Sequence, residues 1–304
     1  MPEPRAPLSA AEVGAFHQTL SNWGRWGARD QLGALNLITP AKRVAAAALV
    51  RSGRTVSCAR ALPTEASADN PNPVVHLMSG TATENYGADY VALAPHGFAT
   101  SHIDALCHIF HDGKLYNGYP TESVTAHGAL ELGIHELHDG VLSRGVLLDL
   151  PHVRGVEFLA PGEPIFVDDL ERAEARGAVR VAEGDVLLVH TGRWAYRDAH
   201  GPWNAREGLA GLDASCLPWL HARGVAALGC DGVSDVLPSR IAGMTLPIHT
   251  VAIVAMGLHL IDNLDLRRLA AACVTEGRWE FVLTIAPLVL RRGTASPVNP
   301  IASF

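Results

Sequence analysis

The stretch that decides the fold is DVLLVHTG, residues 185–192, in which four apolar residues follow one another without a polar interruption. Two other runs share that character, GVLLDL at 145–150 and FVLTIAPLVL at 281–290. Strands that are buried on both faces have continuous apolar runs of this kind, because helices cover both sides of their sheet. The three runs therefore predict a buried sheet that is parallel or mixed.

Helical patterns alternate with these strands. Thr39 precedes Pro40 and an alanine-rich run, which is typical of an N-cap before a first helical residue and predicts a helix that ends near Gly53. Further helices are expected at 168–176, 213–223 (with Asp213 as N-cap) and 266–273, and shorter strands at 54–59, 73–78 and 90–94. Such alternation is typical of the α/β class. Because no segment has the composition of a flexible linker, we expect one domain over residues 1–304, with a mixed, partly barrel-like sheet flanked by helices.

The composition excludes several classes of partner. The 304 residues include 24 Lys and Arg against 31 Asp and Glu, a formal net charge of −7, whereas nucleic acids and anionic membranes attract a concentrated basic face. Five cysteines are scattered without a CxxC pattern, which favours a reducing cytoplasm. No signal peptide is visible, and the apolar stretch 250–261 is shorter than the ~20 residues of a membrane span. We expect a soluble cytoplasmic protein that acts on a small molecule.

Residues that can bind a metal ion or transfer a proton are most concentrated in PHGFATSHIDALCHIFH, residues 95–111. On an extended strand, alternate residues share a face, so that His102 and Asp104 would be neighbours there, together with His96. If a helix begins near Asp104, His108 stands one turn further on and faces the same pocket. The end of a strand that leads into a helix is also where α/β sheets place ligands.

Imidazoles and a carboxylate in this arrangement favour a divalent metal ion. Neutral imidazole and carboxylate suit Zn²⁺ or Mn²⁺, and a catalytic site keeps one position open for water, whose pKa the metal lowers. The alternative is that His102 and His108 are structural histidines and that Asp104 is an N-cap.

Residues 101–108, SHIDALCH, resemble the second half of the HxGTHxDxPxH motif of the cyclase family of metal-dependent hydrolases. That family includes bacterial kynurenine formamidases, isatin hydrolase and trans-dienelactone hydrolase. Phe98 stands where the family has its first motif histidine. Either His96, two residues earlier, replaces it through a bulge in the backbone, or this ligand is lost. The stretches 22–36, 246–249 and 257–266 also resemble the family, which extends the likeness over most of the chain.

The resemblance implies a swivelling β/β/α fold and a set of site residues. The metal ligands would be His102 and Asp104, with His96, His249 and Asp262. Asp262 stands where the family has a Glu one methylene longer, which favours one Mn or Zn ion over two.

The resemblance also implies roles around the metal. His108 matches the family's proton-transfer residue, and an imidazole with an ordinary pKa of about 6.5 exchanges protons near neutral pH. The alternative is that His108 binds the metal, since a six-coordinate Mn²⁺ has room for it. Trp23, Trp26 and Phe98 would contact the substrate, and residues 1–38 would cover it. The polar loops 67–73 and 198–208 are also long enough to cover a site.

These features predict a metal-dependent hydrolase that opens a small cyclic amide or lactone, or cleaves an aryl formamide, with His108 as general acid and base. Two alternatives remain. The first is a small-ligand-binding protein with a degenerate metal site, and the second is a metal-assisted cyclase or dehydratase. The family resemblance further implies a homodimer or a larger homo-oligomer.

Overall fold

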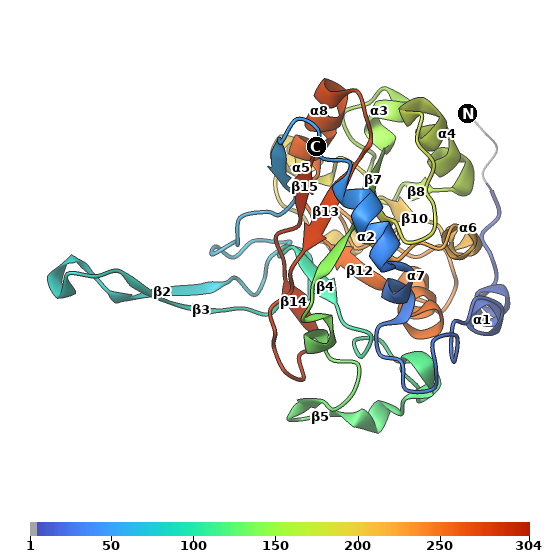
Figure 1. Cartoon of the computed structure of the whole chain (residues 1–304), viewed down its shortest axis with the longest axis horizontal. Helices are drawn as coiled ribbons and strands as arrows, with labels where there is room; N and C mark the ends of the chain where they lie inside the picture. Colours follow the sequence, from blue (N-terminus) through green and yellow to red (C-terminus); the bar gives the residue numbers. More distant parts are fainter. Residues whose placement is uncertain (1–4) are drawn as a thin grey trace.

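The computed structural model describes residues 5–304, so the first four residues of the expected covering segment 1–38 lie outside the described part. At its centre is a curled mixed sheet of nine strands (Figure 1). From one edge to the other these are β1 (Thr55–Ser57), β15 (Ile301–Ser303), β13 (Glu280–Ile285), β7 (Val141–Asp149), β9 (Val186–His190), β11 (Ala227–Cys230), β12 (His259–Asp262), β4 (His102–Asp104) and β14 (Ala295–Pro297).

The four strands β7, β9, β11 and β12 run parallel, and the strands on either side of them pair antiparallel. The predicted runs 145–150 and 185–192 lie in β7 and β9, and every residue of β9 is buried. The predicted α/β class with a buried mixed sheet is thereby confirmed. The run 281–290 forms a strand only as far as Ile285, since Pro287 has no N–H to donate to a sheet.

Helices surround the sheet. Of the predicted ones, α2 begins at Pro40 with Thr39 as N-cap but ends at Ala47, well before Gly53. In the predicted helix 213–223, Asp213 caps a 3₁₀ turn, and the α-helix begins only at Leu217. The α-helices are α1 (Ala10–Thr19), α2 (Pro40–Ala47), α3 (Leu150–Arg154), α4 (Val167–Gly177), α5 (Arg193–His200), α6 (Leu217–Ala222), α7 (Pro247–His249) and α8 (Arg267–Glu276), and η8 (Thr250–Met256) is π-helical.

Packing of these helices leaves one large core and a second, small apolar cluster around Leu209, Val233 and Leu237. Helix α2 lies over β7 and β13 on the face turned to the viewer in Figure 1, and η8 packs on β12. None of the helices formed by residues 5–304 has the length and apolar character needed to cross a membrane.

The expected helix at Asp104 does not form. Asp104 is the last residue of β4, which lies between β12 and β14, and the N–H of Ala105 continues the pairing by donating to the carbonyl of Thr294. A turn follows, closed by a hydrogen bond from the N–H of His108 to the carbonyl of Ala105. Pairing with the distant strand β14 thus outweighs the local helical pattern.

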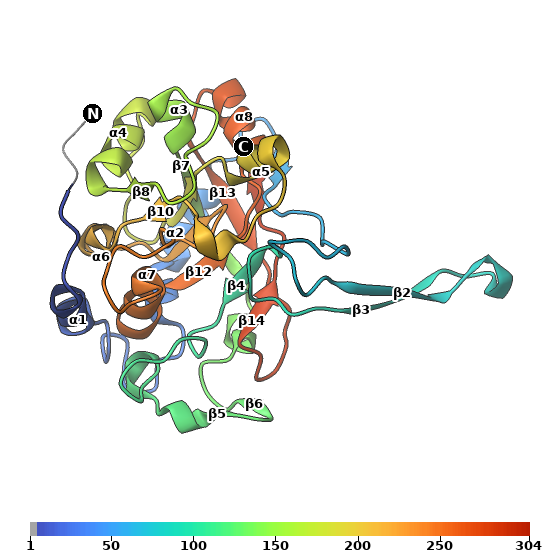
Figure 2. The same ribbon diagram turned by 180° about the vertical axis from the view of Figure 1, so that it is seen from behind.

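A two-stranded arm projects from this body. It consists of β2 (Val75–Gly80) and β3 (Ala88–Ala92), which pair antiparallel around a tip that contains a short 3₁₀ turn. Figures 1 and 2 show the arm extending well beyond the rest of the molecule. The remaining two-stranded pairs are small, β8 (Pro164–Ile165) with β10 (Gly211–Leu212) and β5 (Val124–Thr125) with β6 (Gly128–Ala129).

Candidate metal centre

The strands β4 and β12 bring three polar side chains to one face of the sheet. His102 and Asp104 are two residues apart in β4, and Asp262 of β12 stands directly opposite His102 in the antiparallel pair. Residues opposite each other in such a pair point to the same side. Ile103 points the other way and is fully buried in the core. The apolar and polar alternation of β4 therefore places its two ionisable residues together.

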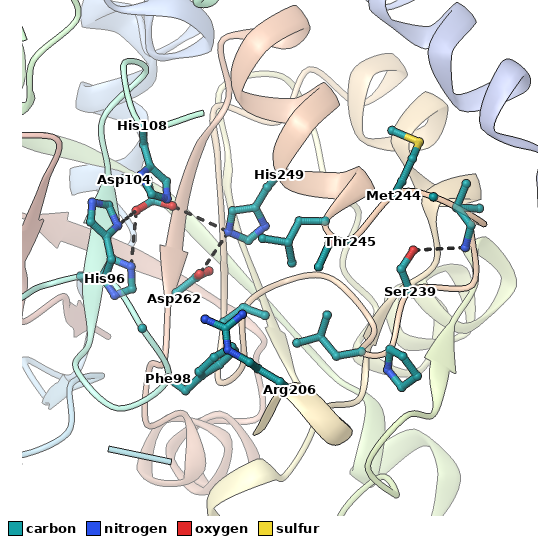
Figure 3. Close-up of a pocket in the computed structure, with 18 of the residues that line it drawn as sticks. His96, Phe98, Asp104, His108, Arg206, Ser239, Met244, Thr245, His249 and Asp262 are labelled. Atoms are coloured by element: carbon teal, nitrogen blue, oxygen red, sulfur yellow. Dashed lines mark hydrogen bonds and ion pairs between the residues drawn. The ribbon is translucent and has the colours of Figure 1, made fainter. Parts of the chain in front are cut away.

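Helix α7 supplies a fourth side chain, His249. Asp235 accepts hydrogen bonds from the backbone N–H groups of Ile248 and His249, at 2.7 and 3.2 Å. The same carboxylate accepts a hydrogen bond from His249 Nδ1 at 2.6 Å. With Nδ1 held in this way, Nε2 points toward Asp104 and Asp262 (Figure 3).

Asp104 lies between two groups of possible ligands. On one side are His96 and His102, whose Nδ1 and Nε2 atoms lie 3.1 and 3.4 Å from Asp104 Oδ1. On the other side is His249, whose Nε2 lies 3.8 Å from Asp104 Oδ2 and 3.3 Å from Asp262 Oδ2. Within each group of three, the ligand atoms all lie within 4.8 Å of one another. Each group has the size of a metal site.

The residues fit a cation because their facing atoms lack other partners. Within the described part of the chain, both oxygens of Asp104, His96 Nδ1 and Asp262 Oδ1 are buried without a hydrogen-bond partner. Buried polar atoms are rarely left so, because an unmade hydrogen bond costs about 1–3 kcal/mol. The outer nitrogens of His102 and His249 already bond to the carbonyl of Thr100 and to Asp235, which is how proteins orient ligating imidazoles.

Two histidines stack at the edge of this cluster. The rings of His96 and His108 lie 3.8 Å apart and are tilted by 12°. His96 Nε2 shares a hydrogen bond of 3.0 Å with the hydroxyl of Thr294, the residue before β14. His96 therefore lies within the cluster, and that it replaces the family histidine at the position of Phe98 stays a prediction.

The irregular backbone before β4 explains how His96 reaches the cluster. Gly97 adopts φ +127°, which few side chains tolerate. The carbonyls of Gly97 and Thr100 accept hydrogen bonds from the Asn263 amide, and that of Phe98 accepts one from the buried Arg193. These tethers turn residues 97–100 away from a regular strand, so the expected alternation is wrong for residues 96–100, whereas His102 and Asp104 do share a strand face.

Burial and charge shift the pKa values of these groups. Burial would raise the pKa of Asp104, but the His102 and His96 imidazoles hold it well below its ordinary value. Burial would lower the pKa of His249, but Asp235 and Asp262 hold it well above its ordinary value. Burial lowers the pKa of His108 to about 4. At neutral pH, Asp104 is therefore an ionised carboxylate, and the imidazole of His108 is neutral.

The cluster forms one wall of a cavity of about 670 Å³. His96, His102, Asp104, His108, His249 and Asp262 all line it, and Phe98 lies on the same wall. Most of the opposite wall comes from residues 233–246, which connect β11 to α7 and contribute mainly apolar side chains: Val233, Leu237, Ile241, Met244 and Leu246. A volume of this size is typical of a small-molecule site.

The structure brings seven of the nine predicted site residues together and leaves two outside. Trp23 and Trp26 do not line the cavity, nor does any other residue between 5 and 38. The indole of Trp23 donates to the carbonyl of Val254, and Trp26 packs against the core and under Arg25. That these residues cover or contact the substrate stays a prediction.

Sequence reasoning missed several residues of this site. Asp235 follows β11 in the DGVSD stretch, and no local pattern there predicts its contact with His249, 14 residues further on. Arg206, from the loop 198–208, lies 5.4 Å from the Phe98 ring at the cavity wall. Thr294 carries no sequence signal that connects it with His96.

Comparisons with known proteins agree with this geometry. The cyclase family model, described as "Putative cyclase", matches residues 34–235. A solved structure described as a novel cyclase is 30% identical with a TM-score of 0.85, covering 95% of this chain and 99% of that chain. No curated protein matches.

Two isatin hydrolases share the fold at lower identity. One, bound to the product analogue thioisatinate, is 16% identical with a TM-score of 0.58 and covers 86% of this chain and 94% of its own. Isatin hydrolase A from Ralstonia solanacearum is 19% identical with a TM-score of 0.56, covering 82% and 91%. The family match spans most of the chain and includes the SHIDALCH stretch that carries three of the clustered residues, and the chain therefore belongs to the cyclase family.

Proposed function

We propose that this protein is a metal-dependent hydrolase that opens a small cyclic amide or lactone, or cleaves an aryl formamide. The observation that carries the proposal is the Asp104 carboxylate, whose buried oxygens lack hydrogen-bond partners among residues 5–304 and face two groups of ligand atoms on a cavity wall. The fold that the chain shares with isatin hydrolases supports the choice of hydrolysis over other carbonyl chemistry.

The ion would be held by His96, His102 and Asp104, with His249 and Asp262 completing its surroundings. A divalent ion supplies a Lewis acid for the substrate carbonyl and lowers the pKa of a water molecule from about 15.7 to about 7. Imidazole and carboxylate ligands suit both Mn²⁺ and Zn²⁺. We propose one ion, although the two groups that share Asp104 offer room for a second.

His108 is placed to move the proton. It lines the cavity beside the ligands, and its lowered pKa leaves the imidazole neutral, with one unprotonated ring nitrogen, at neutral pH, as a general base requires. It would take the proton from the attacking water and pass it to the departing nitrogen or oxygen. The stacked His96 ring fixes the plane of the His108 imidazole during this exchange.

The rest of the cavity suits a compact, largely apolar substrate. Phe98 and the apolar residues of 233–246 would contact the faces of a ring, while the carbonyl to be attacked points to Asp104. Arg206 is the cationic side chain of the lining and would favour a substrate with an anionic group.

The test is to assay the protein against isatin, trans-dienelactone and formylkynurenine, before and after removal of metal. We expect activity on at least one of these classes, loss after chelation, recovery with Mn²⁺ or Zn²⁺, and about one ion per chain by elemental analysis. Hydrolysis adds one water to the product mass, which separates it from a dehydratase or cyclase reaction. Equal activity of stripped and loaded protein, or binding without turnover, would overturn the proposal.

A further inference from the structure

The last turn of η8 is capped by two residues from the other end of the sequence. Helices leave their final carbonyl groups without donors from their own backbone. Here the indole Nε1 of Trp23 donates to the carbonyl of Val254 at 2.7 Å, and the side-chain amide of Asn22 donates to that of Met256 at 2.8 Å. The backbone N–H of Asn22 donates to the carbonyl of Ala255, between them, at 2.9 Å. Asn22 and Trp23 therefore satisfy three consecutive buried carbonyls.

The next carbonyl is satisfied from the same part of the chain. The backbone N–H of Ala34 donates to the carbonyl of Gly257 at 2.8 Å. Gly33 and Gly257 approach closely there, and a Cβ on Gly33 would collide with the Gly257 carbonyl. Residues 22–34, the N-terminal clamp, thus cover the whole end of η8.

The N-terminal clamp is held in place by contacts of its own. Asp30 accepts hydrogen bonds from the N–H of Gly33 at 3.0 Å and from the hydroxyl of the buried Tyr116 at 2.9 Å. The side-chain amide of Asn117 donates to the carbonyl of Gly27 at 3.0 Å. These bonds fix the clamp to the body independently of its bonds to η8.

The helix that the clamp holds carries a candidate metal ligand. His249 ends α7 and directly precedes η8. Asp235 accepts three hydrogen bonds at the start of this helical unit, from the N–H groups of Ile248 and His249 and from the His249 ring. The unit is therefore fixed at one end by Asp235 and at the other by the N-terminal clamp.

The capped end of η8 also leads to the other ligands of the same group. After Gly257 the chain enters β12, which ends at Asp262. The first residue of that strand, His259, is fully buried, and its Nδ1 donates to the backbone carbonyl of Asp104 at 2.8 Å. A shift of the capped turn would therefore displace His249, Asp262 and Asp104, the three members of one group of ligand atoms.

The π-helical form of η8 depends on the Trp23 donor. Helices of this kind are rare, and single π-turns frequently lie at functional sites. The N–H of Leu258 donates to the carbonyl of Ala252, whereas an α-helix would pair it with the carbonyl of Val254, four residues earlier. Trp23 occupies that carbonyl. Without the indole donor, η8 is free to change to the α-helical register, which would turn His249 away from its present place.

We propose that Asn22 and Trp23 are positioning residues of the candidate metal centre, which keep His249 beside Asp104 and Asp262 by capping η8. Neither residue lines the cavity, so their effect on the metal passes through His249. The inference deepens the proposed function and rests on it for the identity of the ligand, a divalent metal ion.

The first experiment measures the Mn²⁺ and Zn²⁺ dissociation constants of purified variants by calorimetry. Trp23→Phe keeps an aromatic ring but removes the N–H donor, and Asn22→Asp keeps the shape but loses the amide donor. We expect each to weaken binding about three- to tenfold, the range that loss of one hydrogen bond produces. Circular dichroism and melting verify that the variants are folded.

Trp26→Phe is the matched control. Trp26 belongs to the N-terminal clamp, but it packs against the core and under Arg25 and takes no part in the cap. We expect this variant to bind metal with wild-type affinity. Wild-type affinity in both Trp23→Phe and Asn22→Asp overturns the proposal.

A double-variant cycle shows whether the effect passes through His249. In a His249→Ala background, adding Trp23→Phe should weaken metal binding no further, because the ligand that the cap positions is gone. An equal reduction in both backgrounds contradicts a positioning role and assigns Trp23 to general stability.

Kinetics separate positioning from substrate contact. With a substrate that the protein turns over, Trp23→Phe should lower kcat at saturating metal and leave KM unchanged. A rise of KM alone would mean that Trp23 contacts the substrate, as the family resemblance implies, and would overturn the proposal.

Hydrogen exchange on the metal-free protein keeps the test apart from that of the proposed hydrolase. We expect the N–H groups of residues 250–262 to exchange several-fold faster in Trp23→Phe and Asn22→Asp than in wild type or Trp26→Phe, while those of β7 and β9 stay unchanged. Equal exchange in all four proteins contradicts the capping role. If the wild-type chain binds no metal, the proposed hydrolase fails, and this measurement still decides whether Asn22 and Trp23 hold the helix of His249.

Discussion

His249 donates a hydrogen bond of 2.6 Å from Nδ1 to Oδ2 of Asp235, and this carboxylate also accepts the backbone N–H of His249. Asp235 thus fixes both the orientation of the imidazole and the nitrogen that carries its proton. Nε2 is left as the atom that faces Asp104 and Asp262. Asp235, which the sequence analysis did not assign to the site, therefore positions one of the candidate ligands.

We expect Asp235→Asn to weaken metal binding about 10- to 100-fold, because loss of such a supporting carboxylate has an effect of that size. The amide cannot accept every donor that now faces the carboxylate. The measurement is the Mn²⁺ or Zn²⁺ dissociation constant by titration calorimetry. Asp265→Asn is the control, since Asp265 pairs with Arg267. Equal affinities in wild type and Asp235→Asn would show that His249 is not a ligand.

Asp104→Asn is expected to abolish metal binding, because Asp104 belongs to both groups of ligand atoms. His96→Ala and Asp262→Ala each remove a ligand from one group only, and each should lower affinity without abolishing it. Elemental analysis of the purified variants checks this order. Full metal content in Asp104→Asn would place the ion elsewhere.

His108→Gln is expected to lower kcat by about 10²- to 10⁴-fold, the usual contribution of a positioned acid or base. Metal content should stay at the wild-type level if His108 moves protons and is not a ligand. Kinetics and elemental analysis on the same preparation separate the two roles. Loss of metal together with activity would assign His108 to the ligands.

Arg206→Gln tests the source of substrate preference. An exposed charge pair contributes up to about 1 kcal/mol, so KM or the inhibition constant should rise about two- to fivefold for carboxylate-bearing compounds such as trans-dienelactone. Isatin, which is neutral, should be unaffected. An equal change for both compounds would mean that Arg206 shapes the cavity and does not recognise charge.

Stability should fall in mild acid through His17 of α1. Burial lowers the pKa of His17 to about 4, against an ordinary value of about 6.5, and His111 stacks on its ring at 3.6 Å. The unfolded chain therefore binds the proton more tightly, and the contribution of His17 is complete above pH 6.5 and is lost as the pH falls toward 4.

His17→Gln should flatten the dependence of unfolding free energy on pH between about 6.5 and 4. The half-buried ring is partly screened by water, so the difference should be about 1 kcal/mol. Denaturant titrations across this range check it. Parallel curves for wild type and variant would exclude His17 as a contributor.

How much of this structure the sequence predicts depends on how far apart the interacting residues lie in the sequence. The apolar runs of β7 and β9 are visible because burial on both faces leaves a continuous pattern. The spacing of His102 and Asp104 is visible because alternation in a strand is local. Whether a helix begins at Asp104 could not be decided from the sequence, because the competing pairing partner, β14, lies almost two hundred residues away.

The rest of the site depends on long-range geometry. The contact of His249 with Asp104 joins positions 145 residues apart, and only family resemblance pointed to it. The loop 198–208 was predicted as a possible cover of the site, but neither Arg206 within it nor Thr294 was singled out, because neither a loop arginine nor a lone threonine carries periodicity. The arm was visible as two short strands, but its projection from the body is a property of the whole fold.

The tethered backbone at residues 97–100 has a consequence for how such sites diverge among related proteins. Since Asn263 and Arg193 hold this segment in an irregular path, a histidine two positions upstream reaches the cluster while Phe98 forms part of the cavity wall. If the proposed metal centre uses His96, a ligand position has shifted along the chain while the imidazole still reaches Asp104. Recognition of relatives by a fixed spacing of motif histidines would overlook chains of this kind, whereas a search for the three-dimensional cluster would find them.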